Sequence, residues 1–136
     1  MSHENVELLR RVTRIFNAAQ GDESLFAPVL APGFRIDNIV TAVTDKTYHG
    51  AAGCIEWFGD MADAFEEGAR YEIEAIIADR DDFVVARFAF LGVGVRSGAP
   101  LHLRWIGVTW SRDGKLTRAA GYANRHEALK AVGLEE

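Results

Sequence analysis

The sequence predicts an α+β protein in which helices cover one face of a curved antiparallel sheet. Between His3 and Ala19, apolar residues recur at the spacing of an amphipathic helix. Two stretches rich in β-branched and aromatic residues flank Arg112-Asp113-Gly114-Lys115, where Asp-Gly suits a type I′ hairpin turn. With 136 residues, the chain fits one domain spanning residues 1–136.

The hairpin predicts a register. Pairing Arg112 with Lys115 places Val108 opposite Ala119, with every second residue on the same side of the sheet. Large side chains then lie beside small ones on one face, which leaves room for a packed helix or a cavity. The large side chains of that face are His102, Arg104, Ile106, Val108 and Trp110.

The N-terminal half predicts helix, turn and strand. Ser2 caps the first helix, Asp22 caps a second short helix that extends to Leu30, and Pro28 keeps this helix short. Residues 34–39 alternate like a strand. The alternation places Phe34, Ile36 and Asn38 on one face and Arg35, Asp37 and Ile39 on the other.

A third helix begins at Gly50 and ends at Gly68, and strands follow at residues 71–78 and 83–96. Asn124 caps a last short helix that stops at Gly133. The expected order is therefore ααβαββββα, with the helices on one face of one sheet.

Composition excludes several functions. The chain has 15 basic and 20 acidic residues and a net charge of −5, which argues against nucleic-acid binding. No apolar run is long enough for a bilayer, and the polar start does not resemble a signal peptide, so we expect a cytoplasmic protein without membrane contact. Cys54 is the one cysteine, and no His/Cys spacing resembles a zinc site. We therefore expect no disulfide, metal or cofactor.

Four short sequence motifs occur in a fixed order along the chain. They are ENVELLRRV with FNAAQGD, then Tyr48-His49-Gly50, then WSRDGKL, and last YANRHEALKAVGL. With the element order, they resemble the SnoaL-like branch of the NTF2-like (cystatin-type α+β cone) superfamily over nearly the whole chain. The resemblance implies a curved antiparallel sheet with helices on one face that enclose a conical apolar pocket. Since this superfamily includes ketosteroid isomerases, polyketide cyclases, limonene-epoxide hydrolases and binding modules, it does not specify the function.

The resemblance also implies site residues. The family's carboxylates correspond here to Ile106 and Gly121, and the isomerase base corresponds to Asn38, which a one-residue bulge would exchange for Asp37. The candidate catalytic residues are Asn38, His102 and Arg104, where histidine suits proton transfer near neutral pH and arginine can bind an oxyanion. The candidate ligand-binding residues are Tyr48, Trp57, Phe58, Met61, Ile106, Val108 and Trp110.

Structural roles compete with these assignments. His102 can be an exposed histidine at a strand end, and most of the aromatic residues can belong to the core. Arg104 can form a salt bridge with a helix carboxylate, Glu56, Asp60 or Asp63. One function hypothesis is an isomerase, cyclase or hydrolase acting on a polyketide-, steroid- or terpene-like substrate. The other is a non-catalytic small-ligand-binding or dimerisation module, which the missing carboxylates favour.

The opposite face of the hairpin predicts a partner. In the predicted register Trp105 lies opposite Tyr122 on a face that is too apolar for water, with no helix left to cover it fully. We therefore expect a homodimer through the Trp105/Tyr122 face, together with a small apolar molecule as ligand.

Overall fold

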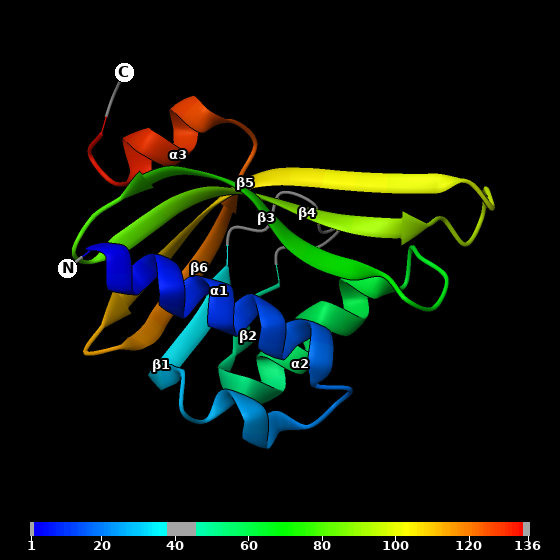
Figure 1. Cartoon of the computed structure of the whole chain (residues 1–136), viewed down its shortest axis with the longest axis horizontal. Coiled ribbons are helices and arrows are strands. Elements are labelled where there is room, and N and C mark those ends of the chain that lie inside the picture. The colour runs from blue at the N-terminus through cyan, green and yellow to red at the C-terminus, as the bar shows by residue number, and fades with distance from the viewer. Residues whose placement is uncertain (1, 38–45, 135–136) are drawn as a thin grey trace.

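The computed structural model describes residues 2–37 and 46–134. Within them, three α-helices and a short 3₁₀ helix surround a six-stranded sheet of order β2-β1-β6-β5-β4-β3, which confirms the predicted α+β class (Figure 1). None of the helices in these ranges has the length and apolarity to cross a membrane. The elements are α1 (Ser2–Ala18), η1 (Glu23–Phe26), β1 (Leu30–Asp37), β2 (Tyr48–His49), α2 (Gly50–Ala62), β3 (Arg70–Asp79), β4 (Phe83–Val93), β5 (Pro100–Arg112), β6 (Lys115–Tyr122) and α3 (Arg125–Ala131).

Two predicted helix caps are confirmed. The Ser24 N–H donates to Asp22 Oδ1 (3.0 Å), and the Glu127 N–H donates to Asn124 Oδ1 (2.9 Å). The second helix is shorter than predicted, a single 3₁₀ turn, and α2 ends at Ala62 instead of continuing to Gly68.

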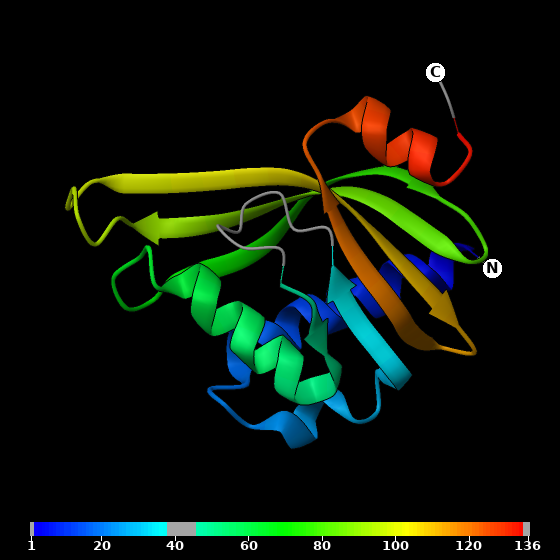
Figure 2. The same ribbon diagram turned by 180° about the vertical axis from the view of Figure 1, so that it is seen from behind.

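The sheet is antiparallel except where β1 pairs in parallel with β6 (Figure 2). Ile36 lies beside Ala119, and both Phe34 and Ile36 are buried, which confirms the predicted alternation of the first strand. Asn38 lies outside the described residues. β1 and β6 are far apart in the sequence, but as neighbours in the sheet they together form part of its inner face.

The hairpin turn is confirmed, but the register beyond it is wrong by one residue. Arg112 pairs with Lys115 across Asp113 and Gly114, which both have positive φ, as a type I′ turn requires. A bulge at Thr117 then shifts β6, so that its later residues face different partners. Thr109 pairs with Ala119, Gly107 with Gly121 and Ile106 with Tyr122.

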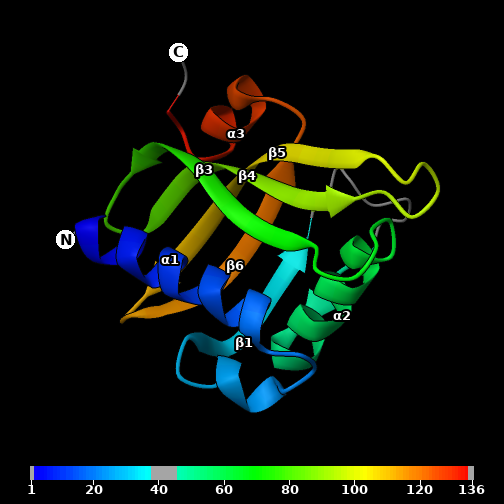
Figure 3. The same cartoon turned by 45° about the vertical axis from the view of Figure 1, so that its right-hand side comes forward.

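Helices α1 and α2 cover the inner face of the sheet, and the main hydrophobic core lies between them and the strands. Helix α3 lies on the other side, which corrects the expectation that all helices share one face (Figure 3). Its Ala128 and Leu129 pack with Phe83, Val85 and Val108 in a second cluster. The outer face carries these apolar residues, and α3 is the element that covers them and shields them from water.

Candidate functional site

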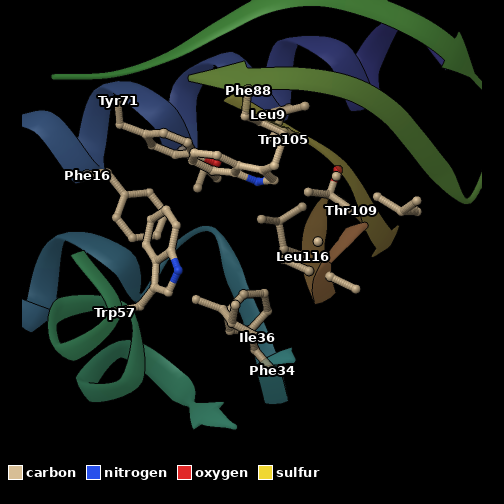
Figure 4. Close-up of a pocket in the computed structure, with 16 residues that line it drawn as sticks. Leu9, Phe16, Phe34, Ile36, Trp57, Tyr71, Phe88, Trp105, Thr109 and Leu116 are labelled. Atoms are coloured by element: carbon tan, nitrogen blue, oxygen red, sulfur yellow. The ribbon is translucent and has the colours of Figure 1, made fainter. Parts of the chain in front are cut away.

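A cavity lies in the main core between the inner face of the sheet, α1 and α2 (Figure 4). The cavity has a volume of about 50 Å³, and its walls are mainly apolar. The lining residues are Leu9, Val12, Phe16, Phe34, Ile36, Trp57, Tyr71, Phe88, Trp105, Gly107, Val108, Thr109, Leu116, Ala119, Ala120 and Gly121.

Small residues on β6 create part of this space. Ala119 and Gly121 pair with Thr109 and Gly107 of β5, so little side-chain volume fills the sheet surface there. Trp105, on the same face of β5, closes the cavity from the side. Two of the small residues chosen from the sequence, Ala119 and Gly121, therefore line the cavity, and of the large residues expected beside them only Val108 does.

Aromatic rings form one wall. The rings of Tyr71 and Trp105 are nearly parallel, at 3° with centroids 5.9 Å apart, and Phe88 extends the stack at 21° and 6.0 Å from Trp105. Trp57, from α2, meets the Tyr71 ring edge-on at 71° and 5.2 Å. Figure 4 shows these rings on two sides of one space. Such a wall suits a flat apolar molecule.

The polar groups of the cavity are neutral. Trp57 Nε1 is the one buried side-chain nitrogen or oxygen without a hydrogen-bond partner among the described residues. Burial raises the pKa of Tyr71 far above its usual value, so its hydroxyl keeps its proton at any ordinary pH. Thr109 adds a second hydroxyl. These groups donate hydrogen bonds and carry no charge.

Two of the predicted ligand-binding residues, Trp57 and Val108, line the cavity. Phe58 instead stacks on Phe16 (14°, 6.0 Å) within the core. The Tyr48 hydroxyl donates to Asp60 Oδ2 (2.5 Å), away from the cavity lining. Met61 borders a separate, more open hollow that is also lined by Asp60, Asp63, Leu101 and Leu103.

His102 and Arg104 lie on the outer face, which corrects the face assigned to them. Leu101, Leu103 and Trp105 pack in the main core, so the alternating residues point the other way. Both side chains contact a carboxylate of β3. His102 Nε2 lies 2.8 Å from Glu74 Oε2, and Arg104 Nε donates to Glu74 Oε1 (2.8 Å).

The salt bridge expected for Arg104 therefore exists, but its partner is a strand carboxylate and not one of the helix carboxylates Glu56, Asp60 or Asp63. Partial burial raises the pKa of Glu74, but the hydrogen bonds and charges of Arg104 and His102 together hold it below its usual value. The catalytic roles of His102 and Arg104 stay predictions, and the structure gives these residues a structural contact.

Ile106 and Trp110 also lie on the outer face, in the cluster beneath α3. The Arg118 guanidinium lies 4.4 Å from the centre of the Trp110 ring, a cation–π contact. The expected Trp105/Tyr122 dimer face is not one surface, because Trp105 belongs to the main core and Tyr122 to the cluster under α3. The bulge at Thr117 explains the difference, since it pairs Tyr122 with Ile106.

Asp37, the alternative catalytic base, lies on the outer face as well. Arg118 Nη2 donates to Asp37 Oδ1 (2.9 Å) and Arg35 Nε donates to Asp37 Oδ2 (2.8 Å). Partial burial alone would raise the pKa of Asp37, but these hydrogen bonds hold it below its usual value. The carboxylate is thus ionised and engaged by two guanidinium groups outside the cavity.

Sequence reasoning did not select Tyr71, Trp105 or Thr109 as site residues. Thr109 and Trp105 alternate with the residues that were selected, so a correct face assignment would have found them. Tyr71 has a weaker signal, a single aromatic residue at the start of a strand, and only its packing against Trp57 and Trp105 reveals it.

A family model for the SnoaL-like domain matches residues 9–119. The chain belongs to the SnoaL-like domain family. The match confirms the predicted resemblance, and it covers every residue that lines the cavity except Ala120 and Gly121. No curated protein matches the chain.

Solved structures show the same fold. An NTF2-like protein of unknown function from Mesorhizobium loti is 21% identical, with a TM-score of 0.63 and coverage of 91% of this chain and 93% of that one. A Bacillus cereus protein provisionally named as a polyketide cyclase is 19% identical (TM-score 0.65, 98% and 83% covered). A Catenulispora acidiphila protein with a ketosteroid isomerase-like fold, solved with trimethylamine, is 16% identical (TM-score 0.66, 94% and 93% covered). At these identities the likeness establishes the fold alone.

Proposed function

We propose that this SnoaL-like protein binds a small, neutral, apolar molecule in the inner cavity and acts as a binding module. One observation carries the proposal. None of the described lining residues is an aspartate, glutamate, histidine, lysine, arginine or cysteine. Proton-transfer catalysis needs a positioned acid or base with a pKa near the working pH. The cavity supplies apolar surface and neutral donors instead.

Other ionisable side chains of the described residues do not supply the cavity with a catalytic acid, base or nucleophile. Cys54 is buried in the main core, and burial raises the pKa of its thiol to about 12, so it is not a thiolate nucleophile at neutral pH. Tyr71 is protonated for the same reason. The carboxylates of Asp37 and Glu74 are bound by cationic side chains on the outer face.

Filling the cavity tests the proposal. Toluene added to ¹⁵N-labelled protein is expected to shift the amide signals of the cavity residues, such as Ala119 and Gly121, and to saturate. Ala119→Leu adds three carbons on the cavity side of β6 and is expected to abolish these shifts. Ala123→Leu, at an exposed position just after β6, is the matched control and should leave them unchanged. Saturable shifts that persist in Ala119→Leu would contradict the assignment of the site.

An isomerase, polyketide cyclase or hydrolase is the second candidate. The donors Trp57 and Tyr71 favour it, because neutral donors in a dry site can stabilise an oxyanion. Hydrogen exchange distinguishes the two functions. An enzyme that removes a proton beside a carbonyl should accelerate deuterium uptake into the methyl group of acetophenone in heavy water, whereas a binding module should leave the rate at its uncatalysed value.

A further inference from the structure

We infer that the cavity selects a neutral single-ring molecule whose carbonyl or ether oxygen accepts a hydrogen bond from Trp57 Nε1. This inference rests on the proposed function, because it names the class of ligand for the same cavity. It goes beyond apolar binding, since it assigns a specificity-determining residue and a required chemical group.

The Trp57 indole carries the argument. Trp57 is only 5% exposed, and its N–H has no partner among the described residues. A buried donor that is left unpaired costs free energy, so native proteins pair nearly all of them. The nitrogen has almost no surface open to water, so water does not serve as the partner.

A ligand reaches this nitrogen only if the Trp57 side chain moves, because the nitrogen has almost no exposed surface in the structure. Figure 4 shows the nitrogen-bearing edge of the Trp57 indole turned toward the open space of the cavity. The rings around Trp57, including Phe16 and Tyr71, offer only weak π acceptors. In the bound state the indole is expected to rotate so that its nitrogen meets the bound oxygen, since side-chain adjustments are common on binding.

The remaining polar groups define the ligand's chemistry. An indole N–H can only donate, and both Trp57 and Trp105 line the cavity. The hydroxyls of Tyr71 and Thr109 can donate as well, and neither takes part in a hydrogen bond within the described residues. Donors therefore outnumber groups that can only accept, which favours a ligand with acceptor oxygens over an amine or an alcohol.

Charge and volume narrow the class further. A charged ligand would lose its hydration here without a counter-charge from any described lining residue. The cavity volume of about 50 Å³ is below the roughly 150 Å³ of a cavity that binds benzene and far below the roughly 300–1,000 Å³ of sites for drug-sized ligands. A single ring therefore requires the surrounding side chains to move apart, and a four-ring steroid or polyketide requires a much larger rearrangement. The flat wall of Tyr71, Trp105 and Phe88 matches one planar ring.

Acetophenone and α-methylstyrene test the hydrogen bond, because they have nearly the same shape and only the first has a carbonyl oxygen. The protein has three tryptophans, so its ¹⁵N spectrum should contain three indole signals, and the signal lost in Trp57→Phe identifies Trp57. Acetophenone is expected to shift the Trp57 indole proton downfield, and α-methylstyrene is not. This measurement uses the wild-type protein and does not depend on how well a variant folds.

The dissociation constants of both ligands complete a double-mutant cycle. Trp57→Phe is expected to weaken acetophenone relative to α-methylstyrene by about 3- to 10-fold, the range of one neutral hydrogen bond. Any general effect of the smaller ring applies to both ligands and cancels in the ratio. An unchanged ratio together with an unmoved Trp57 signal would overturn the inference and leave the indole paired with its aromatic neighbours.

Two further measurements test the size and the charge of the ligand. 2-Acetylnaphthalene and androstenedione, with two and four rings, are expected to bind at least about tenfold more weakly than acetophenone. Tetramethylammonium is expected not to bind, because no described lining residue carries negative charge. Comparable binding of either larger ketone or of the cation would overturn the ligand class. Binding of neither acetophenone nor α-methylstyrene would refute the proposed function, whereas equal binding of both with no dependence on Trp57 would refute this inference alone.

Discussion

Asp37 lies one position before the residue that resembles the catalytic base of ketosteroid isomerases, yet its carboxylate accepts hydrogen bonds from Arg118 and Arg35 on the outer face. The same Arg118 covers the Trp110 ring. Because the side chain of Asp37 is only 19% exposed, this contact is partly desolvated, and removing one partner would leave the other charge without its counter-charge and destabilise the protein. Asp37 therefore has a structural role that can be measured separately from any activity.

Asp37→Asn is expected to lower the free energy of unfolding by about 1–3 kcal/mol at pH 7, the range for hydrogen bonds to charged groups. The hydrogen bonds hold the pKa of Asp37 below its unfolded value. Its contribution is therefore complete above the unfolded pKa, near 4, and is lost as the pH falls through the folded pKa. Urea denaturation between pH 7 and pH 2.5 measures the difference.

Asp81→Asn is the matched control, because Asp81 is exposed and has no ion pair among the described residues. It should change stability by no more than a few tenths of a kcal/mol, as surface substitutions usually do. A loss for Asp37→Asn that is the same at pH 2.5 and pH 7 would mean that the carboxylate charge is not the cause.

Two of the three glycines in helix α2, Gly53 and Gly59, have opposite surroundings. A Cβ added at Gly53 would lie 2.7 Å from the carbonyl carbon of Tyr48, a backbone atom that cannot move away without shifting β2. A Cβ added at Gly59 would meet nothing within 4 Å. The close approach at Gly53 seats the helix that carries Trp57 against the sheet edge.

Gly53→Ala and Gly59→Ala should therefore have opposite effects. Gly53→Ala is expected to destabilise the protein by about 1–3 kcal/mol through overpacking. Gly59→Ala should stabilise it by about 0.5–1 kcal/mol, because alanine has the better helix propensity. Thermal unfolding of both variants measures the signs, and a stabilised Gly53→Ala would show that the contact with β2 is not tight.

The Thr117 bulge marks the limit of what the sequence could predict at this scale. The turn at Asp113-Gly114, the caps at Asp22 and Asn124 and the alternation of β1 follow from local rules, and all of them occur. A bulge depends on how two long strands twist together, which local rules do not specify. Because the bulge was not predicted, the inner face of β5 was assigned to the wrong side chains, and four candidates, His102, Arg104, Ile106 and Trp110, were misplaced.

For the whole molecule, the family and the fold could be predicted because many weak features agree over most of the chain. The cavity chemistry could not be predicted, because it depends on which neutral groups from seven elements meet around one small space. Trp57 was selected as an aromatic on α2, but its unpaired N–H is visible only once its neighbours are placed.

A homodimer stays a prediction. The surface now expected for it differs from the Trp105/Tyr122 face that the sequence predicted. The uncovered part of the outer face contains half-buried Leu91 beside the Glu74 ion pairs. Sedimentation equilibrium is expected to give twice the mass of the chain, and Leu91→Lys should shift the protein toward monomer. Val95→Lys, at an exposed position after β4, is the control and should not change the mass. A single-chain mass at all concentrations would contradict dimerisation.

The parallel pairing of β1 with β6 also has a consequence for synthesis on the ribosome. β1 emerges early, but its parallel partner β6 ends at Tyr122 and emerges only after the four strands β2 to β5. Until then Phe34 and Ile36 lack the strand that completes their burial, and such exposed apolar segments are what chaperones recognise and what aggregates. The nascent chain also has no finished cavity until β6 has emerged, so a ligand can stabilise the folded protein but cannot assist the folding of the earlier elements.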